Sequence, residues 1–416
     1  MHPELKKLRF SVKPFPVEGA RPVELARTMA VHPLTYQELP YEPEYSLYAG
    51  RLTPEKMTNA SPDEMYWAAR QGIILRHTGE HPFEIAGPDA LTFLQKIFPR
   101  DVSKVRTGRC SYQFACYHDG GMITDGLLLR VANDRFWFAQ ADGDLFSWYM
   151  AHSAGLNVTI TDPDVWVSQV QGPHSMRLLA HLLDGPMPDP WRYFDWAEVS
   201  MAGQKVIISR TGFTNEIGWE IYFRPENDIE MLGDLILEEG TKMGMLLTAT
   251  PGFRGRRIEA GLLSAGQDFT RHTTPFAVGL GKFIDFDCGD FVGREALMAA
   301  DKACRTWGIR VEGGIAMRGR TLYQRGHDIG RVTSSTWSPF QVCGIGIVHL
   351  DIDAQGPGSI VEVDCTDGSR HRAELCALPM YDPKGEIVRG INTTIPQAPE
   401  PWEGIPATEQ MAAKTA

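Results

Sequence analysis

Two carboxylates lie within apolar runs of the sequence, where burial of a charged side chain is unfavourable. Asp125 interrupts the apolar run MITDGLLLRV, and Glu220 lies between Trp219 and Ile221 in a second apolar run, GWEIYF. A buried carboxylate needs hydrogen-bond donors or a ligand to offset the loss of water. Both acids are therefore candidates for a binding or catalytic site. The alternatives are that Asp125 bonds backbone amides in a turn and that Glu220 faces solvent.

A third candidate group is basic. Arg254, Arg256 and Arg257 open the stretch RGRRIEAGLLSAGQD, and Arg271 follows close behind. Phe213 lies in the polar turn that precedes the second apolar run. Carboxylates in a core and arginines at its rim suit a ligand with amino or amide donors at one end and carboxylates at the other, and a reduced folate has that shape. The alternative is a solvated basic helix face, which is the usual fate of charge clusters.

Most common catalytic signatures are absent from the sequence. It contains no GxSxG, no P-loop, no HExxH and no GxGxxG that follows a strand. His77 and His81 are four residues apart, which would make a ligand pair on a helix, but the context RHTGEHP indicates a strand. The seven cysteines include no CxxC pair, which favours reduced thiols over a disulfide frame or a zinc site. We therefore expect no metal.

Length and charge limit the class of protein. A chain of 416 residues is longer than one compact core usually supports, so two or three domains are expected. The net charge of −11 argues against a nucleic-acid or anionic-membrane partner. No stretch is long and apolar enough for a signal peptide or a membrane span. We expect a cytoplasmic protein that acts on a small molecule. The sequence is compatible with a homo-oligomer.

The order of the patterns predicts an α+β fold with four regions. Residues 1–44 are proline-rich and predict an N-terminal arm. Residues 45–300 carry the mixed helix and strand patterns of the main domain. Residues 301–385 contain short strand-like runs between Gly, Pro and Asp turns, which predict a small antiparallel barrel or sandwich. Residues 386–416 lose apolar content and predict a loose tail.

One pattern occurs twice within the main domain. HPFEIAGPDALTFLQKIF and VSQVQGPHSMRLLAHLL both predict a strand, a Gly-Pro turn and a helix. Pro88 and Pro173 suit a first helical position. We interpret the pair as a duplicated unit, hence two related subdomains. Chance is the alternative, because Gly-Pro before a helix is common.

Three ordered segments resemble the glycine-cleavage T-protein family. SRTGFTNEIGWEIYF is similar to one family signature, and RRIEAGLLSAGQDFTRHTTPFAVGLGKF followed by GDFVGREAL is similar to another. GGMITDGLLL lies where the family carries a strand with an essential aspartate. Within the family, YSLYAGRLTP and ADGDL look most like tetrahydrofolate-dependent dimethylsulfoniopropionate demethylases, and aromatic O-demethylases look more distant. The KGCYxGQE segment of the iron–sulfur-assembly branch is missing.

The resemblance implies a ring of three parts, in which two related α/β folate-binding subdomains and a C-terminal antiparallel β-barrel surround a tetrahydrofolate. Asp125 would lie near the reactive nitrogens of the folate, Glu220 would bond the pterin ring, and Phe213 would stack near it. Three further residues are assigned to the cofactor by the resemblance: Gln140, Arg256 and Arg257.

The donor pocket is where the sequence departs from the family pattern. The family usually has Tyr in LYG or SYG where this chain has Ala265, which would enlarge the pocket. Trp67 and Trp337 are candidates for an aromatic wall around a cationic donor. A methoxy-arene donor would instead need a general acid such as Tyr48 or His81.

The implied activity is a demethylase that transfers a methyl group to N5 of tetrahydrofolate. The donor would be a sulfonium such as dimethylsulfoniopropionate, or a related S-, N- or O-methyl compound. Three alternatives stay open: an aromatic O-demethylase, a glycine-cleavage aminomethyltransferase and a non-catalytic folate-binding protein. The presence of both Asp125 and Glu220 argues against the last of these.

Overall fold

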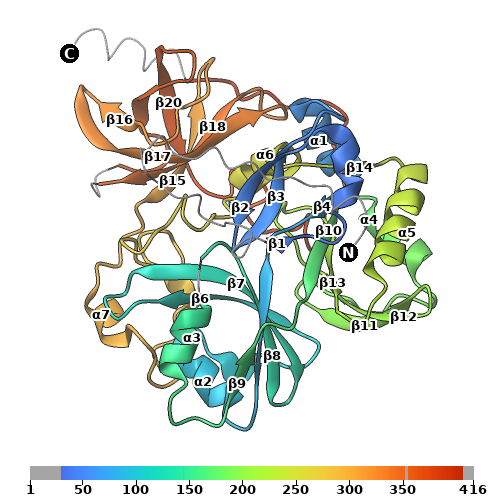
Figure 1. Ribbon diagram of the computed structural model, residues 1–416. Coiled ribbons are helices and arrows are strands. Elements are labelled where there is room, and N and C mark those ends of the chain that lie inside the picture. The colour runs from blue at the N-terminus through green and yellow to red at the C-terminus, as the bar shows by residue number, and fades with distance from the viewer. Residues whose placement is uncertain (1–29, 144, 352–354, 406–416) are drawn as a thin grey trace, which may run out of the picture.

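The molecule is built from three lobes, as Figure 1 shows. The computed structural model describes residues 30–143, 145–351 and 355–405. The ends of the predicted N-terminal arm and C-terminal tail lie outside the described residues. A five-stranded sheet forms the lower lobe in Figure 1, a six-stranded sheet the right lobe, and a closed barrel the upper left lobe.

The first lobe contains a five-stranded sheet of order β6-β7-β8-β5-β9, whose neighbouring strands are all antiparallel. Alternation along these strands buries Ile85, Leu128, Phe136 and Phe138 against the helices. The elements are β5 His81–Ala86, α2 Ala90–Ile97, β6 Cys110–Cys116, β7 Met122–Ala132, β8 Arg135–Gln140, α3 Phe146–His152 and β9 Thr159–Thr161.

The second lobe contains a six-stranded sheet of order β11-β12-β13-β10-β4-β14. Its apolar face forms the largest core cluster with the surrounding helices. The elements are α1 Pro62–Gln71, β4 Ile73–His77, β10 Trp166–Gln171, α4 Ser175–Leu182, β11 Trp196–Met201, β12 Gln204–Ser209, β13 Gly218–Phe223, α5 Ile229–Lys242, β14 Met245–Leu247 and α6 Pro251–Glu259.

The two sheets have the same strand order, and each contains one strand from the other half of the main domain. Strand order 6-7-8-5-9 in the first sheet corresponds to 11-12-13-10-4 in the second. Strand β4 precedes β5 in the chain but pairs with β10, whereas β9 precedes β10 but pairs with β5. This exchange ties the two subdomains together, because neither sheet is complete without a strand from the other half of the main domain.

The repeated turns need glycine for steric reasons. Gly87 and Gly172 have φ of +128° and +120°, and a Cβ on either would lie within 2.6 Å of a carbonyl oxygen. The helices that follow begin at Ala90 and Ser175. The prediction that Pro88 and Pro173 occupy the first helical position was therefore wrong by two residues, because a turn separates each proline from its helix.

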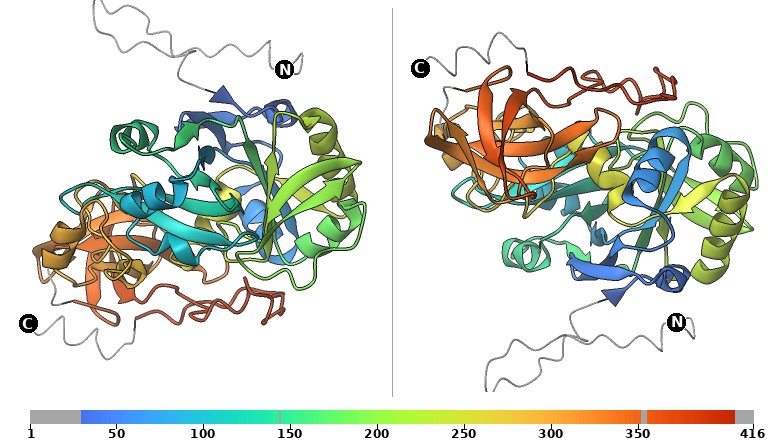
Figure 2. Two further views of the ribbon diagram at one scale, coloured as in Figure 1. Left: turned by 90° about the horizontal axis from the view of Figure 1, so that it is seen from below. Right: turned by 90° about the horizontal axis from the view of Figure 1, so that it is seen from above.

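The third lobe is a closed antiparallel barrel of order β15-β18-β17-β16-β19-β20. It confirms the predicted C-terminal barrel. Its strands are β15 Thr306–Val311, β16 Thr321–Gln324, β17 His327–Ser338, β18 Cys343–Leu350, β19 Ile360–Asp364 and β20 Arg370–Cys376. In Figure 2 the chain that follows the barrel runs back along one side of the molecule towards the second lobe, and Gln71 there donates to the carbonyl of Pro396 (2.8 Å).

A small sheet and several short elements fill the space between the lobes. The small sheet has the order β1-β3-β2, and Figure 1 shows β2 and β3 near the middle of the molecule. The elements are β1 Ala30–Val31, η3 Thr35–Gln37, η4 Leu39–Tyr41, β2 Glu44–Tyr48, β3 Arg51–Lys56, η5 Val102–Lys104, η6 Gly281–Phe283 and α7 Arg294–Ala299. Across the described ranges, no helix has the length and apolar character needed to cross a membrane.

Candidate functional site

A row of four polar residues crosses one face of the second sheet. Arg76 on β4 pairs with Gln169 on β10, Gln169 pairs with Glu220 on β13, and Glu220 pairs with Ser209 on β12. Residues at paired positions in neighbouring strands project from the same face of a sheet. The opposite face of these strands is apolar and forms the core. The row therefore presents polar side chains towards the centre of the molecule.

Glu220 is held firmly in the middle of this row. Its carboxylate accepts hydrogen bonds from Gln169 Nε2 (3.0 Å), Thr211 Oγ1 (2.7 Å) and the Tyr222 hydroxyl (3.0 Å). Burial, reinforced by the charge of Glu80, nevertheless raises the pKa of Glu220 to about 7. Because three donors already position the carboxylate, it can face a ligand in one defined orientation.

Asp125 lies on β7 of the first sheet and is also buried. Its Oδ2 accepts a hydrogen bond from the Tyr112 hydroxyl (2.7 Å). Burial raises the pKa of Asp125 to about 6, and the charge of Asp268 adds to this, whereas the bond from Tyr112 lowers it. A carboxyl group with this pKa exchanges its proton readily near neutral pH.

Tyr48 lies between the two carboxylate regions. Burial raises the pKa of its phenol well above the ordinary value, and the charges of Glu80, Asp125 and Asp142 add to the effect. Arg76 acts in the opposite direction. Groups from both sheets therefore surround one phenol, which brings Asp125 and the row on the second sheet to the same central region. The Tyr48 hydroxyl has no hydrogen-bond partner among the described residues.

His81 and Gln140 have internal partners. The His81 ring contacts Asp162 Oδ2 (2.7 Å) through Nε2 and stacks on Phe83 at 4.5 Å. Gln140 donates to the carbonyl of Gly143 (2.7 Å) and accepts from the amide of Leu145 (3.2 Å). Gln140 thus fixes the loop that follows β8, and its proposed contact with a cofactor stays a prediction.

Both arginines assigned to a folate tail are already engaged. Arg256 has no exposed side chain and forms ion pairs with Glu216 and with Glu259 (2.6 Å). Arg257 pairs with Asp268 (2.8 Å) and donates to the Ser334 hydroxyl. These contacts join α6 to neighbouring segments, so each guanidinium has a structural function here, and the contact of either arginine with a folate tail stays a prediction.

The aromatic residues assigned to the site are dispersed. The Phe213 ring lies 6.1 Å from the ring of Phe253 on α6. Trp67 on α1 packs on Phe340, which lines a cavity of about 430 Å³ beside the segment that follows the barrel. Trp337 lies on β17, where its carbonyl oxygen approaches Gly255 of α6.

Ala265 lies closer to Asp125. It is buried in the cluster that also contains Phe114 and is contacted by Tyr112. The next residue, Gly266, approaches Asp142, whose carboxylate accepts the amide of Ala49 (3.0 Å). The segment around Ala265 thus borders the central region from the side of the first lobe.

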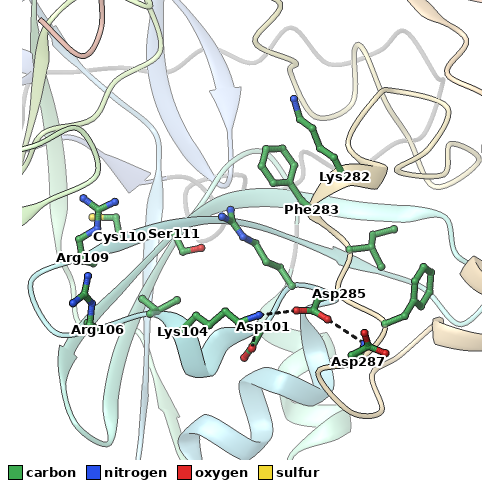
Figure 3. Close-up of a pocket in the computed structure, with 14 residues that line it drawn as sticks. Asp101, Lys104, Arg106, Arg109, Cys110, Ser111, Lys282, Phe283, Asp285 and Asp287 are labelled. Carbon is green, nitrogen blue, oxygen red and sulfur yellow. Dashed lines mark hydrogen bonds and ion pairs between the residues drawn. The ribbon is translucent and has the colours of Figure 1, made fainter. Parts of the chain in front are cut away.

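A cavity of about 690 Å³ lies beside the start of β6. Figure 3 shows Arg106 and Arg109 at one side of it and Lys282 at the other, with Lys104 bridged to Asp285 beneath. Five of its lining residues are cationic and three are anionic, so it is a basic recess on an acidic protein.

Tyr112 joins this basic recess to the central region. Arg100, which lines the recess, donates to the Tyr112 carbonyl (3.1 Å), and the Tyr112 and Phe283 rings lie 5.7 Å apart. The Tyr112 hydroxyl reaches Asp125 on the other side. The recess is thus adjacent to the carboxylate region but distinct from it.

The sequence reasoning missed Arg76, Glu80 and Gln169. Arg76 stacks over the Phe253 ring at 3.9 Å, and Gln169 lies within 3.5 Å of Glu80. Strand alternation could have placed Gln169 on the face opposite Val170, but no local pattern links it to Arg76 or Glu80. Within the described part of the chain, no group of three or more His, Cys, Asp or Glu side chains could hold a metal ion.

Comparison with known proteins identifies the family. Residues 19–288 match the GCVT N-terminal domain, and residues 305–382 match the glycine cleavage T-protein C-terminal barrel domain. The chain therefore belongs to the glycine-cleavage T-protein family, which confirms the resemblance. The crystal structure of the glycine cleavage system aminomethyltransferase T from Bartonella henselae aligns with a TM-score of 0.77 over 85% of this chain and 98% of that one, at 20% identity. This likeness confirms the predicted fold.

Relatives in the family have different activities. The chain is 32% identical over 298 residues to the dimethylsulfoniopropionate demethylase DmdA of Ruegeria pomeroyi (70% of this chain, 81% of that protein). It is 31% identical over 363 residues to an aminomethyltransferase of Anoxybacillus flavithermus (83% and 98%). It is also 32% identical over 357 residues to the trimethylamine-oxide aldolase of Ruegeria pomeroyi, covering 81% of this chain but only 45% of that longer protein.

Tetrahydrofolate is the cofactor of this family, as the resemblance implied. The described residues fit such a ligand. Glu80 Oε2 and Arg76 Nε are buried without a hydrogen-bond partner among the described residues, and Glu220 is oriented beside them. Acceptor oxygens lacking donors suit a heterocycle that carries amino and amide N–H groups. The chain is thus assigned to tetrahydrofolate-dependent one-carbon transfer.

Proposed function

We propose that this chain is a tetrahydrofolate-dependent demethylase that acts on a small methylated donor. One observation supports this most strongly: two buried carboxyl groups with raised pKa, Asp125 and Glu220, come from different subdomains and border one central region. Titratable groups whose environment raises their pKa towards neutrality are typical of catalytic sites. A purely structural pair would be expected to have ion partners, as Arg256 has.

The two carboxylates would have different functions. Glu220, positioned by three donors, would accept hydrogen bonds from the pterin ring, and Phe213 would pack against the ring. Tetrahydrofolate, when bound, supplies the secondary amine N5 that accepts the one-carbon unit. Asp125 would orient that part of the ligand and accept the proton that methyl transfer releases, since its pKa of about 6 leaves it largely ionised at neutral pH.

Positioning would supply most of the catalysis. Methyl transfer is an in-line displacement that needs its three participating atoms collinear and close, so fixing them contributes a large part of the rate. A sulfonium or ammonium donor leaves as a neutral molecule and needs no general acid. A methoxy-arene leaves as a phenolate and would require a proton, for which Tyr48 is better placed than His81, because His81 is paired with Asp162.

The donor is the open part of the proposal. Ala265 provides less bulk than the tyrosine of the family pattern and borders the Asp125 side of the region. This supports a donor larger than the smallest sulfonium compounds. An aromatic O-demethylase is the second candidate function, and the observation that favours it is the Tyr48 hydroxyl, which has no hydrogen-bond partner among the described residues. The glycine-cleavage aminomethyltransferase activity of several relatives is a third, and no described contact selects it.

A single assay separates these functions. The chain is incubated with tetrahydrofolate and a panel of sulfonium, methylammonium and methoxy-arene donors, and the formation of 5-methyl-tetrahydrofolate is followed by chromatography. We expect product with at least one donor and a loss of turnover by about 10²–10⁴-fold in Asp125→Asn with tetrahydrofolate binding retained. Formation of 5,10-methylene-tetrahydrofolate and ammonia from an aminomethyl-lipoyl carrier, with no 5-methyl-tetrahydrofolate from any methyl donor, would contradict the proposal, as would near-normal turnover in Asp125→Asn.

A further inference from the structure

The basic recess beside β6 contains cations that no acid of the described chain neutralises. Two of its five cations, Lys104 and Arg109, pair with aspartates. The other three form no ion pair within 4.0 Å with any described residue: Arg100, Arg106 and Lys282. The chain as a whole has an excess of acids, with a net charge of −11. A cavity lined by one sign of charge attracts ligands of the opposite sign, so this recess is suited to an anion.

Arg100 and Lys282 are two like charges beside one aromatic ring. The Arg100 guanidinium lies 5.0 Å from the centroid of the Phe283 ring, and Lys282 Nζ lies 5.3 Å from the same centroid. Burial lowers the pKa of Arg100 below its ordinary value, and the one hydrogen bond of its side chain to a described residue goes to the Tyr112 carbonyl. An anion bound here would offset both the repulsion between the two cations and the loss of water around Arg100.

The acids of the recess are placed where they leave these cations without a partner. Asp101 and Asp285 share Lys104, at 3.1 Å and 2.9 Å. The third acid, Asp287, is exposed and forms no ion pair with a described residue. Figure 3 shows Asp285 and Asp287 at the side of the recess away from Arg106. The negative charge that this side of the recess lacks must therefore come from solvent ions or from a ligand.

Tyr112 connects the recess to the central region. Its ring lies 5.7 Å from that of Phe283, its hydroxyl reaches Asp125, and the side chain is only partly buried. A folate has its pterin ring at one end, then the reactive nitrogens, then an aminobenzoyl group and finally glutamate. With the pterin at Glu220 and the reactive nitrogens at Asp125, the glutamate end is directed beyond Asp125. Tyr112 and the recess lie on that side.

We propose that the basic recess binds the γ-linked glutamate tail of a folylpolyglutamate, with Arg100, Arg106 and Lys282 facing its carboxylates. The inference rests on the part of the proposed function that assigns Asp125 to the reactive nitrogens, and it is independent of the methyl donor. Each added γ-linked glutamate brings one more carboxylate, which suits several cations along one recess. A volume of about 690 Å³ is of the size that encloses a small molecule or a short chain.

The test is a binding series in which only the tail changes. Tetrahydrofolate with one, three and five glutamates is titrated into the protein by calorimetry, at low and at high salt. We expect the three-glutamate form to bind at least ten-fold more tightly than the one-glutamate form. The gain should shrink as salt is added, because ions screen exposed charges. A free chain of three γ-linked glutamates, which lacks the pteroyl group, should bind far more weakly.

Variants assign the gain to the recess. In the double variant Arg106→Gln with Lys282→Gln we expect the gain to fall below about three-fold, whereas Arg106→Lys, which keeps the charge, should retain most of it. The matched control is Arg177→Gln with Lys205→Gln. It removes the same charge from exposed positions on α4 and β12 of the second lobe, and the gain should persist. Unfolding curves verify that each variant is folded.

Four results would overturn the inference. The first is equal affinity for the one-glutamate and three-glutamate forms. The second is a gain that the recess variant leaves intact, and the third is a gain that the control variant reduces equally. The fourth is tight binding of the free glutamate chain, which would make the recess a site for acidic peptides. Tail-dependent binding without 5-methyl-tetrahydrofolate from any donor would uphold the tail site and contradict only the proposed demethylase activity.

Discussion

Arg256 and Arg76 are both interior arginines, and they differ in what surrounds them. Arg256 is enclosed by Glu216 and Glu259, which themselves receive further hydrogen bonds from other parts of the chain. Arg76 is influenced by the charge of Glu80 but forms no ion pair with any described residue. The closed cluster joins helices and barrel, whereas the open one leaves Arg76 Nε and Glu80 Oε2 buried without a hydrogen-bond partner among the described residues. Burial alone therefore does not distinguish a structural charge from a binding one; the satisfaction of its partners does.

The largest expected effect comes from breaking the closed cluster. Arg256→Met leaves Glu216 and Glu259 buried without their cation, and removing one partner of a buried pair costs about 3–5 kcal/mol. We expect a lower midpoint in chemical denaturation by that amount of free energy, with little change in tetrahydrofolate affinity for the protein that remains folded. A loss of folate affinity without loss of stability would instead make Arg256 a ligand-binding arginine, as the sequence predicted.

The sequence makes one group of arginines more conspicuous than the other for a physical reason. RGRR is a visible cluster, so it led to the assignment of Arg256 and Arg257 to a folate tail, yet some of their partners, Glu216 and Ser334, come from distant segments that the local pattern does not reveal. Arg76 is a single charge in IILRH, and its neighbours in the row, Gln169 and Glu220, lie far along the chain. Only the pairing of strands reveals that row.

The fold and the two carboxylates were easier to predict. Alternating apolar residues and repeated Gly-Pro turns are local signals, so the strands, the helices and the barrel could be read from the sequence. Asp125 and Glu220 were recognisable because an acid within an apolar run is locally conspicuous. The exchange of β4 and β9 between sheets was not predictable, because strand order depends on long-range packing.

The second prediction concerns how ionisation of Asp125 changes the free energy of unfolding. Burial raises its pKa in the folded protein to about 6, above the value of an unfolded chain. Between about pH 4 and pH 6 the unfolded chain ionises first, so ionisation of this group lowers folded-state stability as the pH rises. Asp125→Asn should therefore be more stable than the unmodified protein at pH 8 by about 1–3 kcal/mol. The difference should vanish near pH 4.

This pH dependence can be measured by denaturant unfolding at pH 8 and near pH 4. If Asp125→Asn is more stable but inactive, Asp125 resembles Arg76 rather than Arg256. It is then a residue that serves function and lowers the stability of the fold. If Asp125→Asn is instead less stable than the unmodified protein at pH 8, Asp125 has a structural function like that of Arg256. That result would contradict the assignment of Asp125 to a binding or catalytic role. Glu198→Gln, at an exposed ion pair on β11, is a control that should change stability little at either pH.

A smaller effect is expected at Glu220. Glu220→Gln keeps the size of the side chain but removes the charge that faces the ligand, and hydrogen bonds to charged groups contribute about 1.5–3 kcal/mol. We expect tetrahydrofolate affinity, measured by calorimetry, to fall by at least about ten-fold. Unaltered affinity would show that Glu220 serves only the network of Gln169, Thr211 and Tyr222.

The smallest effect is expected at Tyr112, which supplies a hydrogen bond to Asp125. Its hydroxyl donates to Asp125 Oδ2 and so lowers the pKa of that carboxyl. Tyr112→Phe removes this bond, worth about 1 kcal/mol, and should raise the pKa of Asp125 by less than about one unit. The acidic limb of the turnover profile should then move to higher pH by the same amount. The shift needs an ionised Asp125 in the reaction, since a carboxyl that acted in its protonated form would make turnover at neutral pH rise rather than fall.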